Sequence, residues 1–401
     1  MFSLCHKSPY LTFFCPVNKV IYFLKYNNKP AALHACAFFI PITVIFMNEF
    51  LTYETKRFHY LWLRDNCPCS QCKHDSGQRL HETWQLDASV SILKAEVGEG
   101  GLTVQWDTPD QHQSYYPHAF LMDNCYDDIT PTAKREQLWG SDMQMASYDY
   151  AQVLENDGVK LAWLNDVLKF GIGKLRNVPT QAGTILDVVD QFGFVRSTNY
   201  GDLFEVVSVE KAENLAFTPL PLSLHTDNPY RNPVPTLQLL HCLVKAETGG
   251  VTALADGFKA AEILQKEHPD AFGLLASHKV KFRFSSDDAI LEHRGYMIDT
   301  DKQGQVEAVR INNRSCAPIN VPFEVMADYY AAYQLFVSIL HSEQCKLTTT
   351  LQSGELIVFD NQRVLHGREV QAVGARHLQG CYADRDGLRS TAATLSVKAL
   401  L

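Results

Sequence analysis

The stretch LSLHTDNPYRNPVP, residues 222–235, sets the interpretation of the whole chain. His225 and Asp227 are two positions apart, and on a β-strand the side chains of residues i and i+2 point to the same face. An imidazole and a carboxylate can therefore converge on one metal ion. We predict that the third ligand is His366, in the segment VFDNQRVLHGRE at residues 358–369.

Two histidines and one carboxylate form the facial triad of non-haem iron oxygenases, which leaves open positions on the metal. The pair His-x-Asp alone is weak evidence, but two further residues support the interpretation. Arg376, ten positions after His366, can bind the distal carboxylate of 2-oxoglutarate with its planar fork. Thr252 can donate a hydroxyl to the same carboxylate. The alternatives are an ordinary surface arginine and an ordinary strand threonine.

From about Tyr60 to Arg389 the sequence resembles the γ-butyrobetaine dioxygenase family of 2-oxoglutarate oxygenases. The resemblance implies a double-stranded β-helix (jelly-roll) oxygenase domain, Fe(II), the co-substrates 2-oxoglutarate and dioxygen, and a homodimer. It matches His225, Asp227 and His366 to the iron ligands, and Thr252 and Arg376 to the co-substrate site. The segments that carry it are LWLRDNCPCSQC (61–72), LSLHTDNPY (222–230), LQLLHCLVKAETGG (237–250), LADGF (254–258), FDNQRVLHGRE (359–369) and RHLQGCYAD (376–384).

The resemblance also implies a quaternary-ammonium substrate, which aromatic faces hold through cation–π attraction. The residues that match the family's aromatic cage are Tyr200, Phe204, Phe217 and Tyr382. Two of them depart from the usual pattern, since Phe replaces Trp at position 204 and Tyr at position 217, and Phe binds cations less well than Trp. The alternative is that these are core aromatics.

The anionic end of the substrate has three candidate partners. Asn214 matches a polar substrate contact of the family, and Asn313 and Arg314 lie in the segment RINNRSCAP. Arg314 suits either a carboxylate or a phosphonate, and it is equally compatible with a loop cation at the surface.

Cys67, Cys69 and Cys72 form a second cluster. Three thiolates and one imidazole are typical of a closed, structural Zn(II) site. By resemblance the imidazole is His112, in QHQSYY, although His74 is nearer in sequence; the alternative is three reduced thiols in a loop. The other eight of the 11 cysteines are scattered singly, which favours a reducing compartment over a disulfide framework.

The composition is that of a globular protein: 401 residues, 46% apolar, with a net charge of −9. It excludes bulk disorder and a polytopic membrane protein, and it makes a nucleic-acid partner a poor candidate. We predict a small zinc-binding, β-rich domain at residues 53–140 and the oxygenase domain at 141–395. Residues 1–52 are an extension that is either a targeting segment, an anchor or no part of the folded enzyme.

Within this extension, the apolar run at residues 31–47 falls short of the ~20 residues of a spanning helix. We therefore expect membrane association only if this run is an anchor. Because no Arg-rich transit peptide is visible, we expect a cytoplasmic protein in preference to a mitochondrial one.

Local patterns predict a mainly β fold with helical inserts, arranged as a sandwich or barrel-like roll. A Gly-rich turn at 98–101 separates expected strands at 89–97 and 102–106. One or two helices are expected in 148–170, because Asp157-Gly158 is a turn signal inside the helical pattern, and Ser147 or Asp149 is the expected cap. Further helices are expected at 258–275, interrupted at Pro269, and at 325–341, with strands at 354–360 and 377–383.

The predicted activity is hydroxylation of a trimethylammonium acid, first of all γ-butyrobetaine to L-carnitine. The alternatives are hydroxylation of trimethylammonium-ethyl phosphonate or of trimethyllysine, and a zinc-pinned binding protein without catalysis. The intact set of iron ligands argues against the last of these, and the CPCSQC cluster favours the butyrobetaine branch over trimethyllysine.

Overall fold

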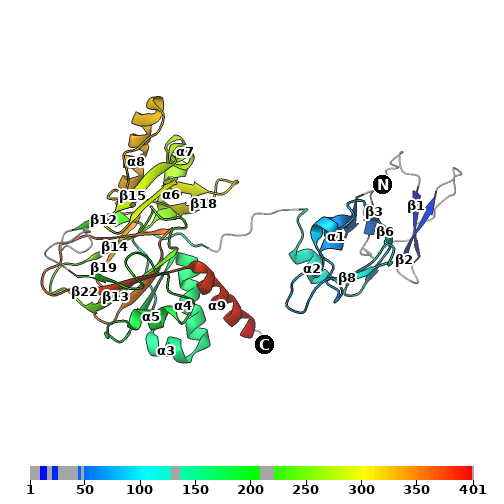
Figure 1. Cartoon of the computed structure of the whole chain (residues 1–401), viewed down its shortest axis with the longest axis horizontal. Coiled ribbons are helices and arrows are strands. Elements are labelled where there is room, and N and C mark those ends of the chain that lie inside the picture. The colour runs from blue at the N-terminus through cyan, green and yellow to red at the C-terminus, as the bar shows by residue number, and fades with distance from the viewer. Residues whose placement is uncertain are drawn as a thin grey trace. The chain divides into compact units, whose positions relative to one another are not determined.

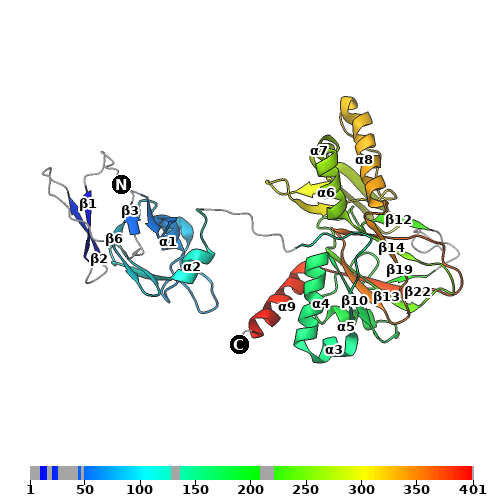
Figure 2. The same cartoon turned by 180° about the vertical axis from the view of Figure 1, so that it is seen from behind.

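The computed structural model describes residues 10–15, 20–25, 44–46, 49–127, 136–207 and 221–399, with side chains from residue 49 onward. The chain divides into two compact units, Met1–Ala133 and Lys134–Leu401 (Figures 1 and 2). Two candidate substrate residues, Asn214 and Phe217, lie outside the described residues, as do residues 31–43 of the apolar run. In the part of the chain that the structure describes, no helix is long and apolar enough to cross a membrane.

The N-terminal unit contains a five-stranded antiparallel sheet in the order β1-β2-β6-β7-β8. The predicted hairpin is confirmed as β6 and β7, although β6 begins after residue 89 because Asp87 accepts hydrogen bonds from the backbone and hydroxyl of Ser89. A three-stranded sheet and two short helices complete the unit. The elements are β1 (Tyr10–Cys15), β2 (Val20–Lys25), β3 (Val44–Phe46), β4 (Phe50–Tyr53), β5 (Lys56–His59), α1 (Tyr60–Asp65), β6 (Ile92–Gly98), β7 (Gly101–Trp106), β8 (Gln113–Pro117) and α2 (His118–Asp123).

Two sheets form the centre of the C-terminal unit. The larger has six strands in the order β11-β22-β13-β20-β10-β9, antiparallel except between β10 and β9. The smaller has four antiparallel strands in the order β12-β21-β14-β19. Their strands are β9 (Ser147–Asp149), β10 (Ile172–Arg176), β11 (Phe204–Val206), β12 (Leu222–His225), β13 (Leu237–Val244), β14 (Thr252–Asp256), β19 (Lys346–Thr349), β20 (Leu356–Asp360), β21 (Val364–Arg368) and β22 (His377–Ala383).

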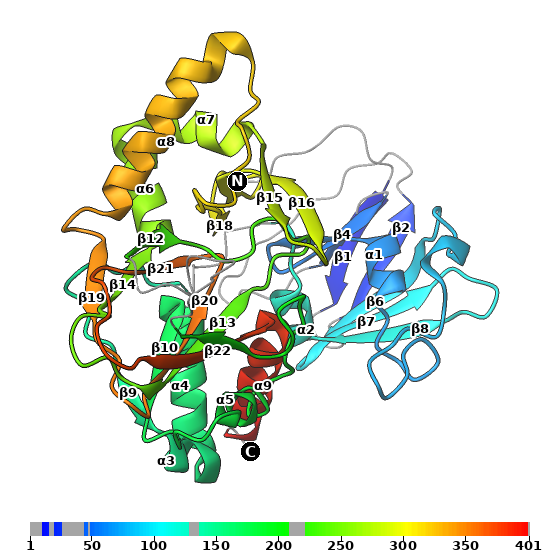
Figure 3. The same cartoon turned by 60° about the vertical axis from the view of Figure 1, so that its left-hand side comes forward.

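Helices cover both outer faces of this pair of sheets (Figures 1 and 3). Buried side chains of α4 and α9 pack on the larger sheet, and those of α6, α7 and α8 pack on the smaller one. Strands β14 and β20 are buried along their whole length because each is covered on both faces. The helices are α3 (Tyr150–Glu155), α4 (Asp157–Phe170), α5 (Thr184–Val189), α6 (Gly257–Glu267), α7 (Pro269–Ser277), α8 (Met326–Leu340) and α9 (Arg385–Lys398).

The prediction of a mainly β unit with helical inserts is confirmed, and the structure resolves the open choice at 148–170. The segment forms two helices, α3 and α4. Asp149 caps α3 by accepting from the backbone N–H of Ala151, and Asn156 caps α4 by accepting from Gly158 and Val159. The second cap ends the first helix and starts the next one. The predicted break at Pro269 likewise separates α6 from α7. Two further hairpins, β15 (Val280–Ser285) with β16 (Ile290–Gly295) and β17 (Ile298–Thr300) with β18 (Val306–Val309), lie between α7 and α8.

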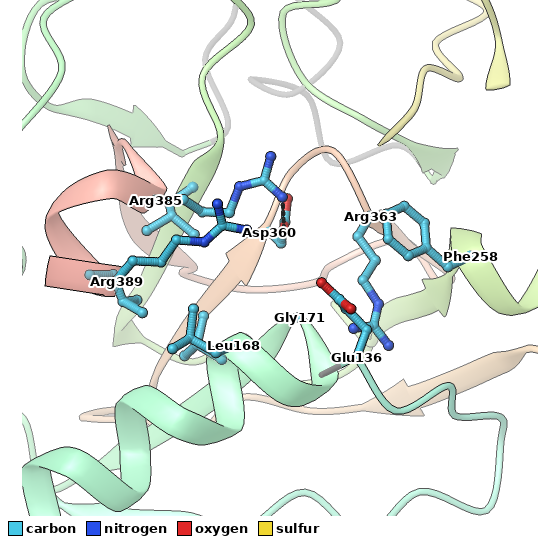
Figure 4. A pocket seen from close by; sticks show the side chains of 11 residues that line it. Glu136, Leu168, Gly171, Phe258, Asp360, Arg363, Arg385 and Arg389 are labelled. Carbon is cyan, nitrogen blue, oxygen red and sulfur yellow. Dashed lines mark hydrogen bonds and ion pairs between the residues drawn. The ribbon is translucent and has the colours of Figure 1, made fainter. Parts of the chain in front are cut away.

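A buried ion pair anchors the first residues of the C-terminal unit. Arg363 donates Nε and Nη2 to the two carboxylate oxygens of Asp256, at 3.0 and 2.8 Å, and neither side chain is more than 1% exposed. The same guanidinium donates to the carbonyls of Gln137 and Lys169, while Asp256 also accepts from the backbone N–H of Trp139. Arg363 lines a pocket with Asp360, Arg385 and Arg389 (Figure 4), in which Arg385 pairs with Asp360.

Candidate active site

Neighbouring strands bring the two predicted histidine ligands together. His225 ends β12 and His366 lies within β21, and the two residues are direct partners across this antiparallel pair. Their ring centroids are 4.3 Å apart, and both side chains are buried. Asp227 follows β12, with Oδ1 3.4 Å from Nε2 of His225. One ligand atom from each of the three residues fits within a cluster in which all atoms are less than 4.8 Å apart.

Backbone and side-chain hydrogen bonds orient the ligands. Nδ1 of His225 donates to the carbonyl of Ser223 at 2.8 Å, which leaves the Nε2 lone pair for a metal. Tyr382 donates its hydroxyl to Oδ2 of Asp227 at 2.9 Å. Asn361 accepts from the backbone N–H of Asp227 and donates to its carbonyl, at 2.7 and 2.9 Å. The side chain and the backbone of Asp227 are therefore held independently.

The protonation states of the cluster suit metal binding. Burial lowers the pKa of His366 to about 3, so this imidazole is neutral at physiological pH. Burial alone would raise the pKa of Asp227, but the adjacent His225 and His366 rings, together with the hydrogen bond from Tyr382, hold it below its ordinary value, so the group is a carboxylate. Burial, followed by the nearby Asp227 carboxylate, raises the pKa of Tyr382, so its phenol stays protonated and can donate.

These residues fit an Fe(II) ion. Two neutral imidazoles and one carboxylate are the donor set that non-haem iron takes, with further positions left for other ligands. The buried Nδ1 atom of His366 has no hydrogen-bond partner among the described residues. Within the same described ranges, the only other cluster of this kind is formed by Cys67, Cys69, Cys72 and His112.

The two predicted co-substrate residues line one narrow pocket. Thr252 begins β14 and Arg376 directly precedes β22, and both line this pocket together with Cys242 and Gly250. Gly250 has a φ of +63°, and a Cβ atom there would lie 3.3 Å from Nε of Arg376. Glycine therefore lets the loop turn closely past the guanidinium.

The structure describes three of the four predicted cage aromatics. The rings of Phe204 and Tyr382 lie 5.1 Å apart. A Cβ atom at Gly380 would lie 2.3 Å from the Phe204 ring, so this glycine leaves room for it. Tyr200 shares a hydrogen bond with Tyr230, hydroxyl to hydroxyl at 3.1 Å.

Of the two described candidates for the anionic end, Arg314 is electrostatically connected to the cluster. Arg314 is exposed, as the alternative of a surface loop cation expects. Desolvation lowers the pKa of Arg314, whereas the Asp227 carboxylate raises it, and the Arg314 charge in turn contributes to the lowered pKa of His366. Asn313 is exposed. The neighbouring Asn312 is buried and donates to the carbonyl of Thr226, which supports the backbone between the first two metal ligands.

Sequence reasoning missed three residues near the site. Asn361 lies in the same motif as His366, which is a signal that its amide has a local role. Tyr230 lies in the motif of His225 and Asp227, and its hydroxyl donates to Asn228. Phe284, on β15, stacks on Tyr230 and contacts the edge of Tyr200, at centroid distances of 5.3 and 5.7 Å. Its position depends on the hairpin, and no local motif marks it.

The cysteine cluster of the N-terminal unit is closed by His112. The three sulfur atoms of Cys67, Cys69 and Cys72 lie 3.3, 3.6 and 3.5 Å from Nε2 of His112. His74 is exposed and hydrogen-bonds Ser76 instead. Four ligand atoms within 4.8 Å of one another fit a tetrahedral zinc site.

Hydrogen-bond donors surround the thiols. Ser114 donates to Sγ of Cys67 at 3.0 Å, and Trp106 in turn donates to the Ser114 hydroxyl. Arg64 donates to Sγ of Cys72 at 3.3 Å. Burial lowers the pKa of His112, so its imidazole is neutral and can serve as a ligand.

Two protein families match the chain. Residues 126–382 match the family described as "Taurine catabolism dioxygenase TauD, TfdA family", and residues 48–122 match "Gamma-butyrobetaine hydroxylase-like, N-terminal". The chain is 37% identical over 343 residues to a gamma-butyrobetaine dioxygenase of Pseudomonas sp. (strain AK-1), covering 83% of this chain and 89% of the relative. It is 34% identical over 359 residues to the gamma-butyrobetaine dioxygenase of Homo sapiens, covering 85% and 92%. A mitochondrial trimethyllysine dioxygenase of Gallus gallus is 32% identical over 358 residues, covering 86% and 84%.

Proposed function

Because the chain belongs to the TauD/TfdA family of dioxygenases and to its γ-butyrobetaine dioxygenase branch, we propose that it hydroxylates γ-butyrobetaine to L-carnitine. The enzyme is a 2-oxoglutarate-dependent dioxygenase. The observation that carries the choice of substrate is the identity of 34–37% to two γ-butyrobetaine dioxygenases over more than four fifths of the chain.

The proposed iron ligands are His225, Asp227 and His366. When bound, Fe(II) with 2-oxoglutarate and dioxygen supplies the oxidising power for hydroxylating an unactivated carbon. The chain's own residues bind and orient. Tyr382 and Asn361 fix Asp227 through the hydrogen bonds described above. Arg376 and Thr252 bind the carboxylate of the co-substrate that is remote from the metal.

The aromatic residues Tyr200, Phe204 and Tyr382 hold the trimethylammonium group in this proposal, together with Phe217. Such a cation offers no hydrogen-bond donor, so ring faces and exclusion of water bind it. Asn214, Asn313 and Arg314 serve the carboxylate at the other end of the substrate. The adjacent rings of Phe204 and Tyr382 support the proposal, because they place two of the matched aromatics at one site.

A substrate panel tests the function. Purified enzyme with Fe(II), 2-oxoglutarate and oxygen is given γ-butyrobetaine, trimethyllysine or trimethylammonium-ethyl phosphonate, and succinate and hydroxylated product are quantified. We expect γ-butyrobetaine to give the highest kcat/KM, with Asp227→Ala as the inactive control. A higher kcat/KM for trimethyllysine would instead assign this enzyme the activity of the trimethyllysine dioxygenase that is 32% identical to it.

The phosphonate has a specific structural feature in its favour, the electrostatic interaction between Arg314 and Asp227. A dianionic phosphonate benefits from a guanidinium more than a carboxylate does. Arg314→Met should therefore lower kcat/KM more for the phosphonate than for γ-butyrobetaine. A wild-type preference for the phosphonate that disappears in this variant would replace γ-butyrobetaine as the substrate.

We extend the proposal to the remaining predictions. The two sheets of the C-terminal unit are the halves of a double-stranded β-helix, supported by their antiparallel pairing and by the position of the ligands on the smaller sheet. The Cys67, Cys69, Cys72 and His112 cluster binds a structural zinc. The resemblance supports a homodimer, which light scattering of the purified protein tests. The cytoplasmic location follows from the sequence interpretation of the N-terminal segment.

A further inference from the structure

Arg368 lies on the same strand as the ligand His366, two residues further along β21. Side chains two apart on a strand share a face, so Arg368 points to the side of the sheet on which His366 meets His225. Across the ladder Arg368 is the direct partner of Thr252 on β14. Arg368 therefore lies further along the sheet than the metal ligands, beside Thr252, which is proposed to bind the co-substrate.

The Arg368 side chain is buried without satisfied hydrogen bonds. The residue is 5% exposed, and neither its Nε nor its Nη2 atom has a partner in the part of the chain that the structure describes. A buried guanidinium normally has an acceptor for its donors, because desolvation of an unpaired charge is costly. The neighbouring Glu369 does not provide one, since it pairs with Lys346.

Other arginines of the same unit show the usual arrangement. Arg363 has a bidentate carboxylate partner in Asp256 and two backbone carbonyls, and Arg385 pairs with Asp360 (Figure 4). Both of these arginines are satisfied by the protein itself. Arg231 and Arg310 each have a buried Nε without a partner, but both donate through another nitrogen, to Asn199 and to Asp299 respectively. Among the described residues, Arg368 is the arginine with two buried nitrogens that lack an acceptor.

A second cation lies close to Arg368. Thr252, the ladder partner of Arg368, lines one pocket together with Arg376, and the charges of the two guanidinium groups act on each other. At neutral pH both guanidinium groups are charged and repel each other. Among the described residues, neither has a carboxylate partner within ion-pair distance. A buried and a half-buried cation that lack an anion among the described residues favour an anion from outside the chain.

We propose that Arg368 is a second guanidinium of the co-substrate site and, with Arg376 and Thr252, binds the carboxylate of 2-oxoglutarate that is remote from the metal. This inference rests on the proposed function, which makes 2-oxoglutarate the co-substrate. One carboxylate has lone pairs for about four donors, so it can accept from both guanidiniums and from the threonine hydroxyl. A 2-oxo acid without the second carboxylate would leave both cations unpaired. Arg368 thereby contributes to selecting a dicarboxylic co-substrate.

The test compares two oxo acids that differ only in this carboxylate. The affinities of 2-oxoglutarate and 2-oxopentanoate for the Fe(II)-loaded enzyme are measured by titration calorimetry without oxygen. Loss of charge-assisted hydrogen bonds should weaken 2-oxoglutarate by roughly 10- to 100-fold in Arg368→Met. The affinity for 2-oxopentanoate should stay the same or improve, because the variant has one unpaired cation fewer. Arg294→Met, the same change at an exposed arginine of β16, should alter neither affinity.

Two results would overturn the assignment. Unchanged 2-oxoglutarate affinity in Arg368→Met would show that Arg368 does not contact the co-substrate. An equal loss for both oxo acids would show that Arg368 only supports the structure. If Arg368→Met does not fold, the ratio of the two affinities in Arg368→Lys decides: we expect a smaller drop in this ratio, and an unchanged ratio contradicts the proposal.

Failure of the proposed function gives a different result. If the enzyme hydroxylates another amine, the substrate panel changes while the Arg368-dependent preference for 2-oxoglutarate remains. If the wild-type enzyme binds 2-oxoglutarate no better than 2-oxopentanoate, the remote carboxylate has no site, and this inference fails whichever amine is hydroxylated.

Discussion

The two candidate metal clusters of this protein are assembled in the same way but differ in their number of donors. Each joins residues that are close in sequence to one histidine from far along the chain: Cys67, Cys69 and Cys72 to His112, and His225 and Asp227 to His366. The first cluster has four donors and the second has three. A tetrahedral ion is complete with four donors, whereas an ion with three protein ligands has positions left for reactants.

The surroundings of the clusters differ in the same sense. The thiols of Cys72 and Cys67 accept hydrogen bonds from Arg64 and Ser114, and in the described part of the chain no unpaired cation remains beside these sulfur atoms. Beside the histidine cluster, Arg368 and Arg376 have no carboxylate partner among the described residues. Guanidinium donors without a carboxylate acceptor lie next to the three-ligand cluster. They indicate a site that receives reactants more strongly than the ligand types alone do.

The largest expected effect is on the three-ligand cluster. Asp227→Ala removes one ligand and should reduce turnover below detection, because two histidines alone do not retain the ion at its working position. The zinc content and the thermal midpoint should stay close to wild type, since Asp227 is not a core residue. Succinate release and elemental analysis check this, and retained turnover would remove Asp227 from the proposed ligands.

Cys72→Ser tests the closed cluster. Zinc binding to such sites stabilises small domains by several kcal/mol or more, so this variant should lose zinc and unfold its N-terminal unit at lower temperature. The iron content should stay unchanged. Cys125→Ser, a change of a cysteine outside the cluster, is the control for calorimetry and elemental analysis. Full zinc occupancy in Cys72→Ser would contradict the assignment.

Arg376→Met tests the guanidinium donors that have no carboxylate partner. Truncating one partner of a buried charge pair costs about 2–5 kcal/mol, so the Kd of 2-oxoglutarate should rise roughly 100-fold. The affinity for Fe(II) in the absence of 2-oxoglutarate should not change. Calorimetric titration of both measures the two effects separately, and an unchanged Kd would mean that another cation holds the co-substrate.

The smallest effect is expected for Tyr382→Phe, which keeps the ring but removes the hydrogen bond to Asp227. Residues that orient metal ligands typically affect metal affinity by about 10- to 100-fold, and we expect the lower end because Asn361 still holds the Asp227 backbone. Tyr330→Phe on the exposed side of α8 is the control. A loss as large as that of Asp227→Ala would show that Tyr382 itself is essential to the cluster.

Motifs in the sequence were sufficient to predict both clusters, because their members carry chemistry that few other residues share. The choice of His112 over His74 depended on resemblance, and also on the very small ring that the nearer His74 would close. The structure brings His112 to the thiols because strand pairing of β7 with β8 carries it there. Residues without a motif were not predictable in this way.

Phe284 illustrates this limit, and Arg368 shows that even a residue inside a motif can be missed when its role depends on strand register. Arg368 lies within the motif of His366, yet its importance depends on strand register, which pairs it with Thr252, and on the lack of an acceptor. Phe284 reaches Tyr200 only because the hairpin of β15 and β16 folds toward it. Helix boundaries were easier to predict. The two alternatives at residues 148–170, one helix or two, depend on one capping residue, Asn156, whose side chain ends α3 and begins α4.

The ion pair of Arg363 and Asp256 determines where a recombinant fragment of the C-terminal unit can begin. Gln137 and Trp139 give this buried pair a backbone acceptor and a backbone donor. A recombinant fragment or fusion that begins at residue 141 would remove both, whereas one that begins at Lys134 keeps them and matches the start of the compact unit. Exchange of the oxygenase half between related genes should therefore succeed at junctions before Gln137 and fail at junctions a few codons later.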